Sequence, residues 1–107
     1  MGVLGIDVDG TLCKEICFTA EECRNATPRF EVINRIKEVF KDHFVVIATA
    51  RRFDLAEETL IWLDRYHVPY NAITFKKPAV DWLIDDRVQD VENFIAEGLN
   101  GKGIQGR

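Results

Sequence analysis

The sequence predicts a single α/β domain with a mainly parallel sheet. Short apolar runs, typical of buried strands, alternate along the chain with segments whose apolar residues recur at helical spacing. Helices between strands supply the crossover connections that parallel strands require. A length of 107 residues fits one domain with its own core. We therefore expect residues 1–107 to form one unit, in which 13–27 make a small flap and 98–107 a glycine-rich tail.

The first half of the chain predicts two strands and one helix. The run "VLGIDV" (3–8) indicates a short buried strand, and "FVVIAT" (44–49) indicates a strand covered on both faces. Between them, "TPRFEVINRIKEVFK" (27–41) has helical spacing, with Thr27 as the expected N-cap and Pro28 at the first helical position. In the flap, residues 16–18 predict either an apolar tip or a segment buried beneath it.

The second half predicts two helices and two strands. "DLAEETLIWLDRYH" (54–67) reads as a helix, in which Asp54 and Glu57 have capping-box spacing. "NAITF" (71–75) and "VDWLI" (80–84) indicate strands, and the link "KKPA" is too short for a helix, so we expect a loop there. "DDRVQDVENFIAEG" (85–98) predicts a last helix that ends at Gly98.

Composition and charge narrow the class of protein. Hydrophobic residues make up 47% and charged residues 30%, as in an ordinary globular chain. No apolar run is long enough to span a membrane, and the N-terminus lacks the pattern of a signal peptide, so we expect a cytoplasmic protein with no membrane partner. The formal net charge of -4 argues against a broad nucleic-acid surface, although a local basic patch is compatible with it.

Three cysteines, Cys13, Cys17 and Cys23, lie close together in the sequence. An odd number in a chain without an export signal argues against a disulfide framework. A structural zinc site would need a fourth ligand, and neither histidine is near in sequence. Ordinary thiols are therefore the favoured interpretation, with zinc as the minor alternative.

Polar side chains follow each of the four predicted strands. They are Asp7 and Asp9, then Thr49 and Arg51, then Lys76 and Lys77, then Asp85 and Asp86. Because ligands of parallel sheets bind at the carboxyl ends of the strands, we expect these clusters to converge.

The acidic clusters indicate a metal site. Asp7 and Asp9 point the same way in an extended strand, and Asp85 or Asp86 would add more negative charge. Carboxylates this close need a compensating charge, and all-oxygen ligands suit Mg²⁺. The alternative is that the aspartates cap helices or form turns, which would suffice for Asp86 but explains Asp7 poorly.

The other two clusters suit the oxygens of a phosphoryl group. Thr49 offers a hydroxyl, and Arg51 and Lys76 or Lys77 offer cations. Taken singly, Lys77 could be a surface lysine and Thr49 an ordinary strand residue. A metal, a carboxylate nucleophile and a phosphate-binding cation together indicate phosphoryl transfer.

The motifs "DVDGT", "VVIATAR", "KKP" and "WLIDDR" resemble the four motifs of the haloacid dehalogenase (HAD) superfamily, in order, over about Val3 to Phe94. The resemblance implies a three-layer Rossmann-like core with helices on both faces and about four strands in the order 4-1-2-3. Only "GKGIQGR" is left for a short fifth strand. It also implies a capless member, because the segments after the first two motifs are too short for a cap domain.

The resemblance implies a role for each site residue. Asp7 would attack phosphorus and form an aspartyl-phosphate, and Asp9 would act as general acid and then general base. Phosphate would be bound by Thr49, Ala50, Arg51 and Lys77, where Lys77 is preferred to Lys76 because it precedes proline. Mg²⁺ would be bound by Asp7, Asp9 through its backbone carbonyl, Asp86 and Asp85. An acid at the position of Asp9 favours a phosphatase or phosphotransferase.

The substrate is less determined. An open site would accept the end of a large substrate or be covered by a second copy of the chain. "TARR" with "KKPAVDWLIDDR" is similar to phosphatases of capsular-polysaccharide loci, which implies a phosphosugar. "GIDVDGTL" with "IDDRVQDVENF" resembles the 3′-phosphatase domain of polynucleotide kinases, which implies a nucleic-acid end. The negative charge favours a small phosphorylated metabolite. A non-catalytic phosphate-binding module is a further alternative, which the presence of Asp7 and Asp9 disfavours.

Overall fold

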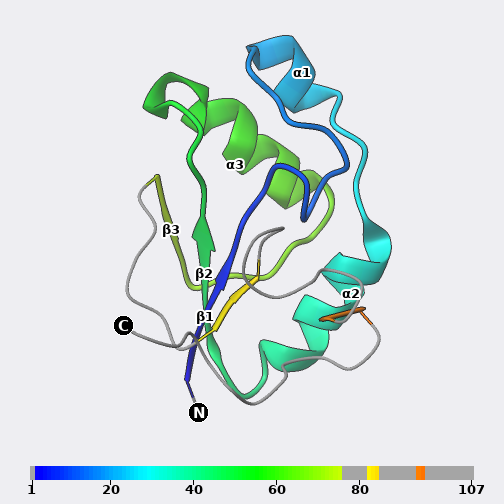
Figure 1. Cartoon of the computed structure of the whole chain (residues 1–107), viewed down its shortest axis with the longest axis vertical. Coiled ribbons are helices and arrows are strands. Elements are labelled where there is room, and N and C mark those ends of the chain that lie inside the picture. The colour runs from blue at the N-terminus through cyan, green and yellow to red at the C-terminus, as the bar shows by residue number, and fades with distance from the viewer. Residues whose placement is uncertain (1, 76–81, 85–93, 96–107) are drawn as a thin grey trace.

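The computed structural model describes residues 2–75, 82–84 and 94–95. The described elements follow each other as strand β1 (Val3–Ile6), helices α1 (Ala20–Arg24) and α2 (Phe30–Val39), strand β2 (Phe44–Ala48), a 3-10 turn η1 (Phe53–Leu55), helix α3 (Ala56–Arg65), and strands β3 (Ala72–Thr74) and β4 (Trp82–Ile84) (Figure 1). Within this part of the chain, no helix has the length and apolar character needed to cross a membrane.

The described strands form one parallel sheet in the order β3-β2-β1-β4. Strand β1 lies between β2 and β4, with Ile6 paired to Ile47 on one side and to Ile84 on the other. The predicted α/β class and parallel sheet are confirmed. The fifth strand considered in "GKGIQGR", the "KKPA" loop and most of the last predicted helix lie outside the described residues.

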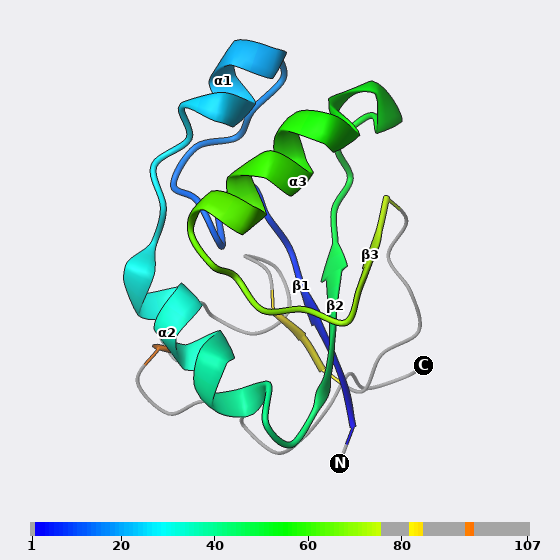
Figure 2. The same ribbon diagram turned by 180° about the vertical axis from the view of Figure 1, so that it is seen from behind.

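Helices α2 and α3 cover the same face of the sheet, as Figures 1 and 2 show from opposite sides. The connections from β1 to β2 and from β2 to β3 run in the same direction across the sheet, so right-handed crossovers place both helices on one side. Each helix turns its apolar stripe inward, and the buried side chains are Val32, Ile33 and Ile36 of α2 and Thr59, Trp62 and Leu63 of α3.

Helix α2 begins later than the sequence predicts. Arg29, not Thr27, is its N-cap, and Pro28 precedes the helix. The reason is that this stretch pairs with the chain after β1: Pro28 forms an antiparallel bridge with Cys13, and the amide and hydroxyl of Thr27 both donate to the Glu15 carboxylate, at 2.8 and 2.6 Å. Thr27 is thus engaged with a carboxylate and does not cap the helix.

The capping box predicted at Asp54 and Glu57 is also wrong. The turn η1 precedes α3, whose N-cap is Leu55 without a side-chain hydrogen bond. The Asp54 carboxylate instead accepts from Nε of Arg52 at 3.0 Å. The local ion pair therefore replaces the cap.

The flap contains a helix that the sequence interpretation missed. Helix α1 has a true capping box: the Thr19 hydroxyl accepts from the Glu22 amide, and the Glu22 carboxylate accepts from the Thr19 amide, both at 3.1 Å. Trp62 of α3 donates to the Ala26 carbonyl at 3.0 Å and anchors the end of the flap. Of residues 16–18, Ile16 and Phe18 are exposed and only Cys17 is buried, so each of the two expectations holds for part of the segment.

Candidate active site at the carboxyl edge of the sheet

A tight turn follows β1 and shapes the site. The carbonyl of Val8 accepts from the amides of residues 11–13 at 2.9–3.2 Å, so the chain reverses direction at once. Gly10 sits in this turn at φ +77°, a conformation that L side chains rarely adopt. No atom would meet a Cβ at Gly10 within 4 Å, so the backbone conformation, not crowding, is what favours glycine. The turn leaves Asp9 at the carboxyl edge of the sheet.

Asp7 lies where β1 and β4 end together. Its side chain is half-buried, and its amide donates to the Ile84 carbonyl at 3.0 Å. Asp85 and Asp86 follow Ile84 directly in the sequence but lie outside the described residues, as do Lys76 and Lys77. Their predicted roles in binding metal and phosphate stay predictions.

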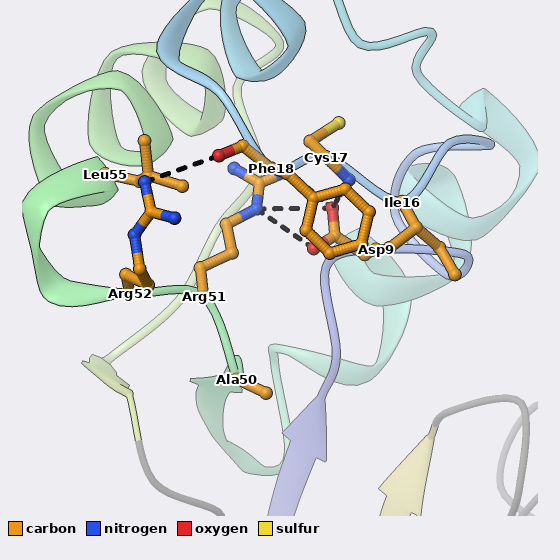
Figure 3. A pocket seen from close by; sticks show the side chains of 8 residues that line it. All are labelled: Asp9, Ile16, Cys17, Phe18, Ala50, Arg51, Arg52 and Leu55. Carbon is orange, nitrogen blue, oxygen red and sulfur yellow. Dashed lines mark hydrogen bonds and ion pairs between the residues drawn. The ribbon is translucent and has the colours of Figure 1, made fainter.

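Asp9 is paired with Arg51, which comes from the loop after β2 (Figure 3). Nη2 of Arg51 lies 2.8 Å from Oδ1 of Asp9, and Nε lies 3.2 and 3.3 Å from the two carboxylate oxygens. The backbone amide of Cys17 also donates to Oδ1, at 3.3 Å. Charge-assisted contacts of this kind fix both the position and the orientation of a carboxylate.

The Arg51 side chain is held from behind by α3. It is 1% exposed, against 17% for Asp9. Nη1 donates to the Thr59 hydroxyl at 2.8 Å, and that hydroxyl donates to the Leu55 carbonyl at the same distance. Burial by itself lowers the pKa of the Arg51 guanidinium, but its hydrogen bonds and charge interaction with Asp9 outweigh burial, so the pKa is raised. Arg51 therefore stays charged.

Thr49 and Ala50 occupy the end of β2 beside this pair. Thr49 is buried, its amide donates to the Thr74 carbonyl at 3.0 Å, and its hydroxyl accepts from the Arg51 amide at 3.1 Å. A hydroxyl that accepts in this way keeps its own proton to donate. Ala50 is exposed and lines the cleft described below. Both positions suit the predicted phosphate contact.

The three cysteines are free, buried thiols. Burial, reinforced by the charge of Asp9, raises the pKa of Cys13 to about 12 and that of Cys17 to about 11; burial also raises the pKa of Cys23. Because the thiolate is the reactive form, these thiols are protonated and inert at neutral pH. The sulfur of Cys13 lies 3.7 Å from Oδ1 of Asp9, as a weak donor.

This edge of the sheet offers two candidate metal sites, which differ in the donor atoms that they supply. One ligand atom each from Asp9, Cys13 and Cys17 lies within 4.8 Å of the others, but these are three donors where structural zinc takes four, and the Asp9 carboxylate is already paired with Arg51, so the group suits zinc poorly. The Mg²⁺ site that the resemblance implies would use the Asp7 carboxylate and the Asp9 backbone carbonyl, which are oxygen donors of the kind that Mg²⁺ prefers. The Asp9 carboxylate would then keep its partner Arg51.

A cleft of about 340 Å³ opens over the Asp9–Arg51 pair. It is lined by residues of the turn, the flap and the loop after β2: Asp9, Ile16, Cys17, Phe18, Ala50, Arg51, Arg52 and Leu55 (Figure 3). The turn, the flap and the β2 loop thus meet at one cavity, and the predicted residues Asp9, Ala50 and Arg51 lie in it.

Sequence interpretation missed several residues of this cleft. Ile16, Phe18 and Arg52 had no predicted part in binding or catalysis, and neither had Thr59, which contacts Arg51 from outside the cleft. The pattern Thr19-Ala-Glu-Glu22 could have indicated α1, because it has capping-box spacing. Nothing in the sequence signals that Arg51 would turn toward a carboxylate forty-two positions away.

Fold and cleft together define an α/β protein with a polar site at the carboxyl ends of parallel strands. The chain matches no family model and no curated protein sequence. It is similar in structure to a chain of the Pnkp1/Rnl/Hen1 complex, with a TM-score of 0.62 and 18% identity over 95% of this chain. A chain of the Pnkp1/Rnl/Hen1 RNA repair complex gives a TM-score of 0.61 and 20% identity over the same share.

These likenesses establish the fold. The chain spans about a third of the length of the two similar chains, 36% and 33%. A third solved structure, the D,D-heptose 1.7-bisphosphate phosphatase from B. bronchiseptica complexed with magnesium and phosphate, gives a TM-score of 0.48 and 16% identity over 73% of this chain and 52% of that one. A TM-score below 0.5 supports no inference.

Proposed function

We propose that the protein is a Mg²⁺-dependent phosphomonoester hydrolase that acts through an aspartyl-phosphate on Asp7. The observation that carries the proposal is the Asp9–Arg51 pair at the carboxyl edge of the sheet, two residues beyond Asp7. Asp7 lies at the end of β1, and Asp9 is oriented by a buried guanidinium that makes three contacts with its oxygens and one with Thr59 of α3. A carboxylate at the strand end beside a second, firmly oriented one suits a nucleophile and an acid–base group.

In the first half of the reaction, an oxygen of Asp7 attacks phosphorus while the bond from phosphorus to the leaving oxygen breaks. Asp9, which lines the cleft, would enter this step protonated and give its proton to the leaving alcohol, and the charge of Arg51 would then stabilise the carboxylate that remains. The hydroxyl proton of Thr49 and the exposed backbone at Ala50 would bind phosphoryl oxygens, together with Lys77. Arg51, predicted from the resemblance to bind phosphate, is assigned here to hold Asp9, because its guanidinium is directed to that carboxylate.

In the second half, Asp9 takes a proton from a water molecule, which attacks phosphorus and breaks the bond to Asp7. Inorganic phosphate leaves and both carboxylates return to their starting state. Bound Mg²⁺ would supply charge neutralisation between the anionic nucleophile and the anionic phosphoryl group. Asp7 and the Asp9 backbone carbonyl, with Asp86 and Asp85, would hold it.

The experiment is hydrolysis of p-nitrophenyl phosphate by the chain with Mg²⁺. We expect turnover that is abolished by a chelator, restored by added Mg²⁺ and lost in Asp7→Asn. The matched control is Asp64→Asn, an exposed aspartate on α3 outside the cleft, which should leave turnover unchanged. Absence of turnover with every divalent metal would instead support a non-catalytic phosphate-binding module.

Two substrate classes follow from the observations. The net charge of -4 favours a small phosphorylated metabolite such as a phosphosugar. The resemblance of "GIDVDGTL" and "IDDRVQDVENF" to the 3′-phosphatase domain of polynucleotide kinases favours a polynucleotide 3′-phosphate, and a chain of an RNA repair complex has a similar fold. A screen of phosphosugars against 3′-phosphorylated oligonucleotides separates them by kcat/KM.

A further inference from the structure

Exposed apolar side chains gather at the mouth of the cleft. Phe18 is 66% exposed and Ile16 is 61% exposed, and both line the cavity beside Asp9. In Figure 3 the Phe18 ring stands over the mouth, and the Asp9–Arg51 pair lies behind it. Large apolar side chains this exposed next to a polar site are typical of a surface that a ligand covers.

The segment that carries these side chains is held in place. The Cys17 amide, between Ile16 and Phe18, donates to Asp9, and the Phe18 amide donates to the Glu22 carboxylate of α1 at 2.8 Å. The Phe18 carbonyl accepts from Nη2 of Arg52 at 3.5 Å across the cleft. Asp9 and Glu22 thus hold the backbone of this segment, the long contact with Arg52 adds little, and the Phe18 ring stays exposed.

Arg52 adds a cation on the opposite wall. Its side chain is 67% exposed and is paired with the equally exposed Asp54 at 3.0 Å. Exposed pairs of this kind are weak, so the guanidinium can turn to an anionic ligand at little cost. Arg51, by contrast, is buried and already neutralised by Asp9. Of the cations that the structure describes in this cleft, Arg52 is therefore the one available to bind a second phosphate.

The volume of the cleft and the residues at its mouth indicate which part of a substrate would bind there. A volume of about 340 Å³ accommodates one small group, not a folded partner. An exposed aromatic face beside an exposed guanidinium is an arrangement that can bind an unpaired base and its phosphate. The net charge of -4 disfavours a long nucleic-acid track, so only the end of a strand would be bound.

We propose that Phe18 and Arg52 form a subsite for the terminal nucleotide of the substrate, in which the base stacks on the Phe18 ring and Arg52 binds the phosphate preceding the scissile one. This inference rests on the proposed function, since it assigns the substrate class of the same site. It makes the protein selective for a phosphate carried by a nucleoside over one carried by a base-free sugar.

Binding is measured by calorimetry, with Mg²⁺ present, to the Asp7→Asn variant. Because this variant lacks the proposed nucleophile, the probes are not hydrolysed during the measurement. The probes are a 3′-phosphorylated thymidine dinucleotide and the same compound with an abasic terminal residue; thymidine 3′-monophosphate distinguishes a free nucleotide from a strand end. We expect the base to strengthen binding about five- to 150-fold, the range of one base–aromatic stack. Phe18→Leu should abolish that difference, and Phe18→Tyr should preserve it.

Phe44→Leu is the matched control, because Phe44 is also exposed but begins β2 at the opposite edge of the sheet. Equal affinity for the two dinucleotides, or an unchanged preference in Phe18→Leu, would overturn the subsite. Failure of the proposed function looks different: the wild-type chain would hydrolyse no phosphomonoester and yet still prefer the ligand with the base. If the wild-type chain hydrolyses p-nitrophenyl phosphate but binds both dinucleotides with equal affinity, the proposed phosphatase function is supported and the proposed subsite is wrong.

Discussion

Nη2 of Arg51 and Oδ1 of Asp9, from residues forty-two positions apart, lie 2.8 Å from each other in a nearly buried ion pair. The pair joins the turn after β1 to the loop after β2, the two segments that carry most of the described candidate site. It also fixes the orientation of the Asp9 carboxylate. The first prediction therefore concerns Arg51.

Arg51→Lys should lower kcat by at least about tenfold, because a lysine ammonium cannot reproduce the forked contacts with Asp9 and Thr59. KM should change little, since Arg51 is assigned to Asp9 and not to phosphate. Arg51→Ala should also destabilise the fold by roughly 3 kcal/mol, the cost of breaking a buried pair. Steady-state kinetics and urea unfolding measure the two effects. A rise in KM with unchanged kcat would instead show that Arg51 binds the phosphate of the substrate.

Asp9→Asn should separate the two halves of the reaction. p-Nitrophenolate leaves without a proton from the enzyme, so Asp7 should still be phosphorylated, whereas water would lack its general base. We expect a burst of about one equivalent of p-nitrophenol followed by turnover slowed roughly 100- to 10,000-fold. Rapid-mixing absorbance measures the burst. Asp7→Asn, which lacks the nucleophile, should give no burst, and a burst in that variant would contradict the assignment.

Thr59 is expected to act through Arg51. Thr59→Val keeps the shape of the side chain but leaves the Nη1 donor of Arg51 without its 2.8 Å partner. A buried unsatisfied donor costs about 1–3 kcal/mol, so the free energy of unfolding should fall by that amount. Thr59→Ser retains the hydroxyl and is the control: its kcat should stay near the wild-type value, while kcat of Thr59→Val should fall.

The raised pKa of Cys13 predicts how stability depends on pH. A thiol whose pKa rises from 9.0 to about 12 on folding holds its proton more tightly in the folded chain. The resulting stabilisation is complete below about pH 9 and is lost as the pH rises toward about 12. The free energy of unfolding should therefore fall over this range, and less steeply in Cys13→Ala. Chemical denaturation at a series of pH values measures it; identical slopes would contradict the burial of the thiol.

Local sequence patterns determined the strands and the longer helices. The apolar runs at 3–8 and 44–49 contain β1 and β2, which are mostly buried, because a strand covered on both faces carries few polar side chains. The run at 71–75 contains the half-buried strand β3, at one end of the described sheet. The helix ends were predicted less well. Thr27 and Asp54 are good caps in isolation, but Glu15 and Arg52 bind them instead, and those partners are set by packing and by a local ion pair.

The polar residues that follow each strand can be identified from the sequence, since the parallel α/β pattern requires the strand ends to share one edge. Which of these residues contact one another depends on how the chain folds. The tertiary structure placed the Arg51 guanidinium against Asp9 and Thr59 and the exposed side chain of Phe18 at the same cleft. The physical reason is that a strand's place in the sequence follows from its local apolar pattern, whereas the direction of a long side chain depends on charges and cavities contributed by distant segments.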